Sequence, residues 1–148
     1  MSRGHEVRAL LDATVLTALL DADHLHHVRA RDWLEANIAT GWASCPLTQS
    51  GCVRILSHPS YPNALKPWEV IDRLREATGA VYHQFWSEGP SLLSPGLVNW
   101  EYIIGSHQVT DAYLLALAVR HGGRLVSFDD AFARSVVPGA EERHLVVL

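Results

Sequence analysis

The chain has 148 residues, of which 48% are hydrophobic and 19% are charged, and its formal net charge is −4 at pH 7. This length suits one domain with a sizeable core and is short for two, so we expect a single domain over residues 1–148. The composition excludes a disordered chain. The net negative charge argues against broad binding to phosphate backbones, because such binding usually needs a basic face. Any contact with a nucleic acid is therefore expected to be local.

The first half of the chain alternates short apolar runs with segments of helical spacing. Residues 7–11 form a mostly apolar run that is typical of a strand buried on both faces, and Gly41 is a stop signal after the second helical segment. Several prolines mark residues 60–67 as irregular. The predicted elements in this half are a strand over 7–11, helices over 15–20 and 26–38, a strand over 42–44 and a helix over 48–56.

The strongest helix signal lies in the second half, over residues 110–121. Thr110 is a favourable N-cap, Asp111 follows in the first turn, and Gly122 and Gly123 are stop signals. The other predicted elements are a helix over 68–78, a strand over 81–86, a loop over 87–96, a short helix over 97–104, a strand over 125–128, a short helix over 131–135 and a strand over 145–148. This alternation favours an α/β fold with a parallel sheet.

The two cysteines, Cys45 and Cys52, have the spacing of neither a zinc knuckle nor a disulfide framework. We expect both to be buried free thiols. The first residues lead directly into a short strand, and no stretch has the character of a signal core or a membrane span. A cytoplasmic protein without membrane contact is therefore expected.

Three acidic residues stand where apolar segments end or a helix begins. Asp12 follows the first predicted strand, Asp129 follows the strand near the C-terminus, and Asp111 opens the strongest helix. Ligands of open α/β sheets bind at the carboxyl ends of the strands, so these side chains can meet at one sheet edge. Crowded carboxylates repel one another, and hard cations such as Mg²⁺ bind carboxylate oxygens. The pattern predicts a metal site and points to phosphate chemistry.

The segments around these acids resemble the PIN-domain nucleases, and more closely the VapC-type ribonuclease toxins of bacterial toxin–antitoxin pairs. The matching segments occur in the family's order and span most of the chain. They are LLDATVL at 10–16, CPLTQSGCVR at 45–54, VTDAYLLALA at 109–118 and LVSFD at 125–129.

The resemblance implies a PIN-like domain, an α/β/α sandwich around a central, mostly parallel sheet. It implies an endoribonuclease that depends on Mg²⁺, or on Mn²⁺, and acts as the toxin of a type II toxin–antitoxin pair. The metal ligands would be Asp12, Asp111 and Asp129, with water between some of them and the ion. The implied partners are an RNA substrate, a small cognate VapB-type antitoxin and a second copy of the chain in a homodimer.

Gln49 departs from the family's pattern, which usually has a Thr-Glu pair here. Thr48 is present, but an amide follows it. The amide oxygen accepts a hydrogen bond from a metal-bound water yet brings no charge and takes no proton. We therefore place Gln49 in the site, and we keep a catalytically weak module that binds RNA or an antitoxin as the alternative.

Three further residues are candidates for supporting the site or binding substrate. Thr14 can hold a phosphate oxygen or orient Asp12, or it can simply cap its helix. Ser127 can support the site or be a buried strand serine. Arg54 can bind a substrate phosphate through its guanidinium fork, with a salt bridge at its helix end as the alternative.

Two other chemistries compete less well. A haloacid-dehalogenase-like phosphatase would use Asp12 as nucleophile, but Thr14 replaces the second Asp of that family and the sole lysine, Lys66, lies in a proline-rich loop. The histidines at 24, 26 and 27 lack the usual spacing of a helical zinc pair, so exposed histidines are favoured over a zinc site.

Overall fold

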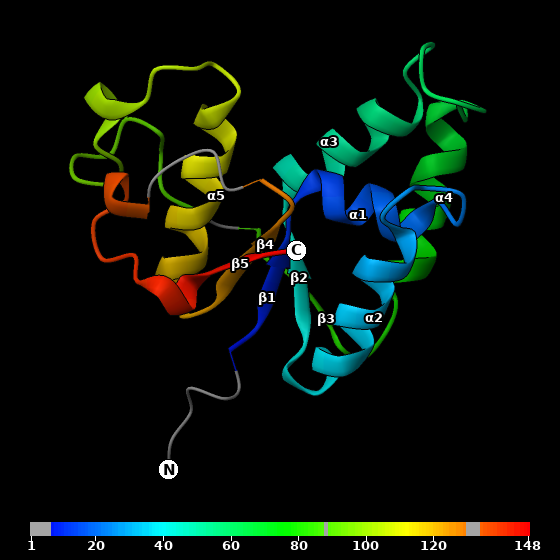
Figure 1. Ribbon diagram of the computed structural model, residues 1–148, viewed down its shortest axis with the longest axis horizontal. Helices are drawn as coiled ribbons and strands as arrows, with labels where there is room; N and C mark the ends of the chain where they lie inside the picture. Colours follow the sequence, from blue (N-terminus) through cyan, green and yellow to red (C-terminus); the bar gives the residue numbers. More distant parts are fainter. Residues whose placement is uncertain (1–6, 88, 130–133) are drawn as a thin grey trace.

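A five-stranded, wholly parallel sheet forms the centre of the molecule, with the strand order β3-β2-β1-β4-β5 (Figure 1). The structure is a computed structural model and describes residues 7–87, 89–129 and 134–148. The predicted α/β fold with a parallel sheet is confirmed. The strands are β1 (Ala9–Leu11), β2 (Trp42–Ser44), β3 (His83–Phe85), β4 (Arg124–Ser127) and β5 (Leu145–Val147).

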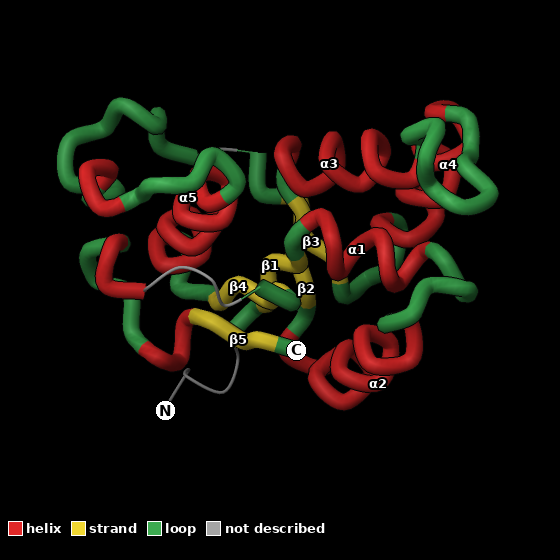
Figure 2. The backbone as a smooth tube through the Cα atoms, turned by 45° about the horizontal axis from the view of Figure 1, so that its top comes forward, coloured by secondary structure: helices red, strands yellow, loops and turns green. Residues whose placement is uncertain are grey.

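Helices cover both faces of this sheet, as an α/β/α sandwich requires. Four of them lie on one face and α5 lies on the other (Figures 1 and 2). The helices are α1 (Ala13–Leu20), α2 (His27–Asn37), α3 (Pro46–Leu56), α4 (Pro67–Thr78) and α5 (Gln108–Arg120). Among the described residues, no helix combines the length and the apolar character that crossing a bilayer demands.

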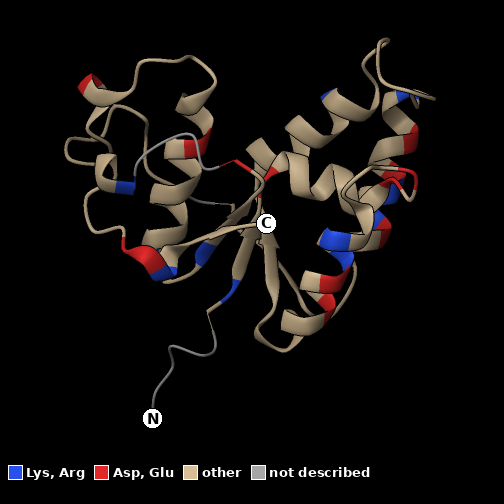
Figure 3. Ribbon diagram, in the orientation of Figure 1, with Lys and Arg blue, Asp and Glu red and all other residues tan. Residues whose placement is uncertain are grey.

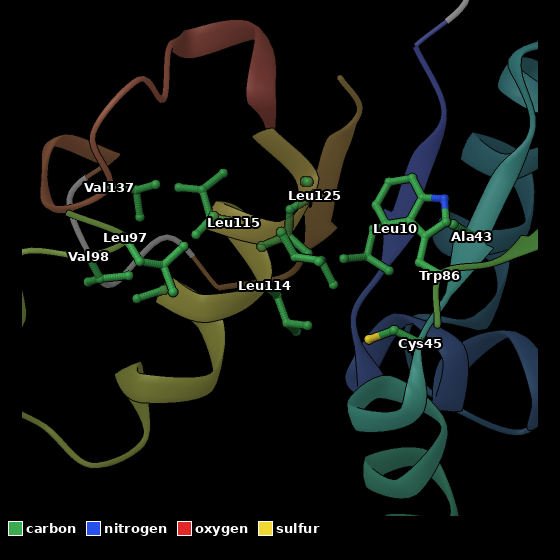
Figure 4. Close-up of a cluster of buried hydrophobic side chains, with 14 of the residues drawn as sticks. Leu10, Ala43, Cys45, Trp86, Leu97, Val98, Leu114, Leu115, Leu125 and Val137 are labelled. Atoms are coloured by element: carbon green, nitrogen blue, oxygen red, sulfur yellow. The ribbon is translucent and has the colours of Figure 1, made fainter. Parts of the chain in front are cut away.

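The core has two halves because successive side chains of a strand point to opposite faces of the sheet. Leu10 and Leu125 belong to the cluster beneath α5, which Figure 4 shows together with Leu114 and Leu115. Their neighbours Leu11 and Val126 belong to the cluster beneath α1–α4. The central strands β1 and β2 are buried throughout; β1 is an unbroken apolar run, whereas β2 ends in the buried Ser44.

Several predicted boundaries are wrong. The strands predicted over 7–11 and 81–86 shrink to Ala9–Leu11 and His83–Phe85. The predicted helix over 97–104 is reduced to the 3₁₀ turn Trp100–Tyr102. Within the predicted helix 131–135, residues 131–133 lie outside the described residues, and a 3₁₀ turn begins at Arg134.

The start of α5 corrects the assignment of Thr110 as N-cap. The helix begins at Gln108, with His107 at the N-cap position, so Thr110 lies inside the first turn. The turn before the helix explains the shift: the backbone N–H groups of Gln108 and Val109 donate to the carbonyls of Gly105 and Ser106. These local acceptors satisfy the first helical donors without a threonine side chain.

Helices α1 and α3 approach each other closely at Gly51. A Cβ atom added there would lie 2.7 Å from the Cβ of Ala13, which is closer than real Cβ atoms come. Ala13 directly follows Asp12, so the fit between these helices also fixes the first acid.

We therefore expect Gly51→Ala to lower the free energy of unfolding by about 1–3 kcal/mol through overpacking. Urea unfolding followed by circular dichroism measures this loss. Gly79→Ala is the matched control, because a Cβ there meets its nearest neighbour at an ordinary 3.4 Å. Adding Ala13→Gly to Gly51→Ala should recover most of the stability. A Gly51→Ala protein as stable as the parent would contradict this account of the contact.

Candidate active site

The site lies where the strand order reverses. From β1 the chain moves outward to β2 and β3, and later returns to place β4 on the other side of β1. In open α/β sheets, ligands bind at the carboxyl ends of the strands beside such a reversal. Asp12 follows β1 directly, and Asp129 comes two residues after the end of β4. The Asp12 backbone N–H donates to the Val126 carbonyl at 3.1 Å, which ties the two strand ends together.

Asp12 is both a helix cap and the most deeply buried of the three acids. Its side chain is 5% exposed, and its Oδ1 accepts hydrogen bonds from the Val15 N–H at 2.9 Å and the Thr14 hydroxyl at 2.7 Å. Burial raises the pKa of the Asp12 carboxyl above its ordinary value, and the hydrogen bonds that it accepts act in the opposite direction. Thr14 is thus placed to orient Asp12, one of the roles predicted for it.

Ser127 links the first acid to the third. This residue is fully buried at the end of β4. Its hydroxyl is hydrogen-bonded to the Asp12 carboxylate and accepts the Asp129 backbone N–H at 3.0 Å. A hydroxyl can donate one hydrogen bond while it accepts another, so a single serine sets the orientation of both strand ends.

Asp111 joins these two acids from the opposite helix layer. It lies in the first turn of α5 and is half-buried. Burial, the negative charges of Asp12 and Asp129, and a side-chain hydrogen bond with Asp129 raise the pKa of Asp111 to about 7. The structure therefore brings together the three acids that the sequence singles out, although they come from distant parts of the chain.

Gln49 is held by a polar chain that sequence reasoning missed. Its Nε2 donates to the Ser44 hydroxyl oxygen at 2.9 Å, and that oxygen lies 2.8 Å from Nε2 of His83. Because Ser44 accepts the amide proton, its own proton is available to the histidine ring, which also bonds the Thr78 carbonyl. Burial lowers the pKa of His83 and so favours the neutral ring that this arrangement needs.

This chain fixes which end of the Gln49 amide is free. The NH₂ group faces Ser44, so the carbonyl oxygen points elsewhere from the first turn of α3. Among the described residues, no hydrogen bond is found between Gln49 and the three acids. The sequence signal for the chain was weak: a serine closing one buried strand and a histidine opening the next.

Arg54 is not placed among the three acids. It is exposed in the last turn of α3 and lines a separate hollow with His58 and Tyr61. In the described part of the chain it forms no ion pair, so the salt-bridge alternative is wrong there. Its predicted contact with phosphate stays a prediction.

The remaining thiols and histidines have local roles. Cys45 and Cys52 are buried and free, as predicted. His24 accepts the backbone N–H of His26 through Nδ1, and Nδ1 of His27 lies 2.8 Å from the Ala18 carbonyl oxygen. Across the described ranges, no group of three or more His, Cys, Asp or Glu side chains lies in an arrangement that could hold a metal ion.

The raised pKa of Asp111 predicts a particular pH dependence of stability. The folded protein holds this proton up to a pH of about 7, whereas the unfolded chain releases it near 3.8. Without divalent cations, the contribution of this proton to the free energy of unfolding should therefore be fully present below pH 3.8. It should be lost as pH rises through about 7. In Asp111→Asn this part of the decline should vanish. Urea unfolding in EDTA across this pH range tests it, with the exposed Asp72→Asn as control. An equal decline in Asp111→Asn and the parent protein would contradict the assignment.

Comparisons with known proteins identify the family of this chain. The family model described as "PIN domain" matches residues 9–136. Ribonuclease VapC44 of Mycobacterium tuberculosis is 50% identical over 142 residues, which cover 96% of this chain and all of the relative. Ribonuclease VapC38 of the same organism is 43% identical over 125 residues, covering 82% of this chain and 84% of the relative.

A solved structure agrees at the level of the fold. The crystal structure of M. tuberculosis VapC20, described as a sarcin–ricin loop cleaving toxin, has a TM-score of 0.58 with 14% identity. The match covers 90% of this chain and 98% of that one. The family match over most of the chain and the identity over the full length of a relative lead to one conclusion: the chain belongs to the PIN-domain family and, within it, to the VapC ribonucleases.

Proposed function

We propose that this protein is an endoribonuclease, the toxin of a type II toxin–antitoxin pair, and that it cleaves RNA with the help of Mg²⁺ or Mn²⁺. The observation that carries the proposal is the meeting of Asp12, Asp111 and Asp129 at the strand reversal, with the pKa of Asp111 raised to about 7. The relatives named as ribonucleases support the reaction class. The same family assignment removes the haloacid-dehalogenase alternative.

The donor set fits a hard divalent cation. Three carboxylates held this close need a positive charge between them, and without a cation a proton on Asp111 fills that need. Mg²⁺ prefers oxygen ligands, binds through one or two carboxylates and keeps several waters. A closed cage of protein ligands is therefore not required.

The chain's own residues would divide the work around such an ion. When bound, Mg²⁺ supplies a Lewis acid for the phosphate and lowers the pKa of a coordinated water. Asp12, Asp111 and Asp129 would hold it. The Ser127 hydroxyl would hold the Asp12 carboxylate and the Asp129 backbone in their relative positions. The free Gln49 oxygen would accept a hydrogen bond from a water in the site, orienting that water without adding charge.

Gln49 also keeps the second candidate function open, a module that binds RNA or an antitoxin with little turnover. An amide in place of a carboxylate weakens the attraction for a cation. The partners that the family implies are a small VapB-type antitoxin and a second copy of the chain. Both are part of this proposal.

The first test concerns cleavage itself. Asp12→Asn, Asp111→Asn and Asp129→Asn should each reduce RNA cleavage by about 100-fold or more, because each removes charge from the ion's site. Asp72→Asn on exposed α4 should leave cleavage unchanged. Product ends should be 5′-phosphate and 3′-OH, since water rather than the 2′-OH attacks, and EDTA should abolish them. Mass spectrometry of the products reads out both. Cyclic phosphate ends that persist in EDTA would sink the proposal, and absence of cleavage by the parent protein would favour the binding module.

A second test concerns Gln49. Gln49→Glu should tighten Mg²⁺ binding several-fold in calorimetric titration, because it adds a negative charge beside a cation site. Gln84→Glu is a suitable control, since Gln84 is exposed on β3 and a carboxylate there can still accept the Trp86 indole N–H. Equal or weaker Mg²⁺ binding by Gln49→Glu would mean that the Gln49 oxygen points away from the ion.

A further inference from the structure

A hollow of about 530 Å³ runs along α3 beyond its first turn, and we call it the α3 hollow. Gly51, Arg54, Ile55, His58 and Tyr61 are among the residues that line it. Gly51, at one end, packs against Ala13, the residue after Asp12. From Gly51, Arg54 is about 4.5 Å further along the helix axis, and His58 follows just beyond the end of α3 at Leu56. The hollow therefore starts near the beginning of α1, which Asp12 caps, and extends toward the end of α3.

The charge of the α3 hollow is unlike that of its surroundings. Arg54 is exposed and forms no ion pair within the described residues, and no Asp or Glu lines the hollow. By contrast, the hollow at the end of α1 is lined by two acids, Asp21 and Asp23, together with Arg73. In Figure 3 the basic positions are dispersed among acidic ones rather than gathered on one face. In a protein of net charge −4, a local cationic hollow is where a polyanion can be held.

His58 adds a directed donor to this hollow. Its Nδ1 accepts the Ser60 backbone N–H at 3.1 Å and lies 2.8 Å from the Ser60 hydroxyl. A neutral ring that accepts at Nδ1 carries its proton on Nε2. The exposed ring can therefore donate to a phosphate or sugar oxygen.

Tyr61 supplies an aromatic wall. Its hydroxyl donates to Oδ2 of Asp21 at 2.5 Å, which anchors the ring between the α3 hollow and the hollow at the end of α1. Ile55 and Pro62 provide apolar surface next to it. Aromatic rings stack on bases with little sequence preference, so a fixed ring beside a guanidinium matches a single-stranded nucleotide.

We propose that the α3 hollow binds the single-stranded RNA that flanks the scissile bond, with a phosphate on Arg54 and His58 and a base against Tyr61. This rests on the proposed ribonuclease function and adds a second contact region to it. It also answers the difficulty posed by the net charge: the RNA is held at a few points outside the acidic site, in a hollow whose own lining contains Arg54 and no Asp or Glu.

The test is the salt dependence of binding to a fluorescein-labelled, mixed-sequence single-stranded RNA of twelve nucleotides, by anisotropy in EDTA to prevent cleavage. Loss of one phosphate contact should reduce the slope of log affinity against log salt by about 0.7 in Arg54→Gln. Tyr61→Leu should weaken binding about 5-fold or more with an unchanged slope. Tyr61→Phe keeps the ring but loses its anchor at Asp21, so it should lose less affinity than Tyr61→Leu. Arg29→Gln, on exposed α2, removes the same charge elsewhere and should change nothing.

Thermal unfolding checks that each variant is folded. Because Arg54 is exposed, Arg54→Gln should fold like the parent. An unchanged slope in folded Arg54→Gln would overturn the assignment. So would unchanged RNA binding combined with lost antitoxin binding or an altered oligomeric state, because the hollow would then serve a protein. The acid variants and product ends test the ribonuclease function separately, so either idea can fail alone.

Discussion

The parallel pairing of β1 with β4 is the contact on which the site depends. It sets Leu11 opposite Val126, so that the residues that follow both strands emerge at the same edge. Strands so close in space, yet separated by most of the sequence, are joined by the Asp12 N–H and by the Ser127 hydroxyl. β1 is the central strand, with β2 on one side and β4 on the other. Helices on either face of the sheet can therefore reach its carboxyl end. Asp111 does so from α5.

The same arrangement sets function against stability. Burying Asp12 and crowding Asp111 against two other acids work against folding when no cation is present. The protein limits this cost locally, because Asp12 also caps α1 and receives several hydrogen bonds. Strain of this kind is common where an active site is built into an otherwise well-packed domain. The tight contact between Gly51 and Ala13 shows how little room the supporting helices leave.

Features that depend on neighbouring residues in the sequence could be predicted, whereas features that depend on contacts between distant segments could not. The strand at Trp42–Ser44 agrees with its prediction to the residue, because the stop signal at Gly41 marks where the helical segment before it ends. The acids were found because each stands at the end of an apolar run or the start of a helix. The start of α5 was missed because a backbone turn, not a side chain, satisfies its first donors. The chain from Gln49 through Ser44 to His83 was missed because it depends on β2 pairing with β3, a contact between distant segments.

The three acids are also spread along the order of synthesis, with Asp12 made early and Asp111 and Asp129 made late. A ribosome that has completed β1–β3 and all four helices of one layer has made only one of the three acids. Docking α5 and inserting β4 beside β1 are the steps that assemble the rest. A nascent chain therefore cannot carry the complete site until Asp129 has been synthesised and β4 has paired with β1.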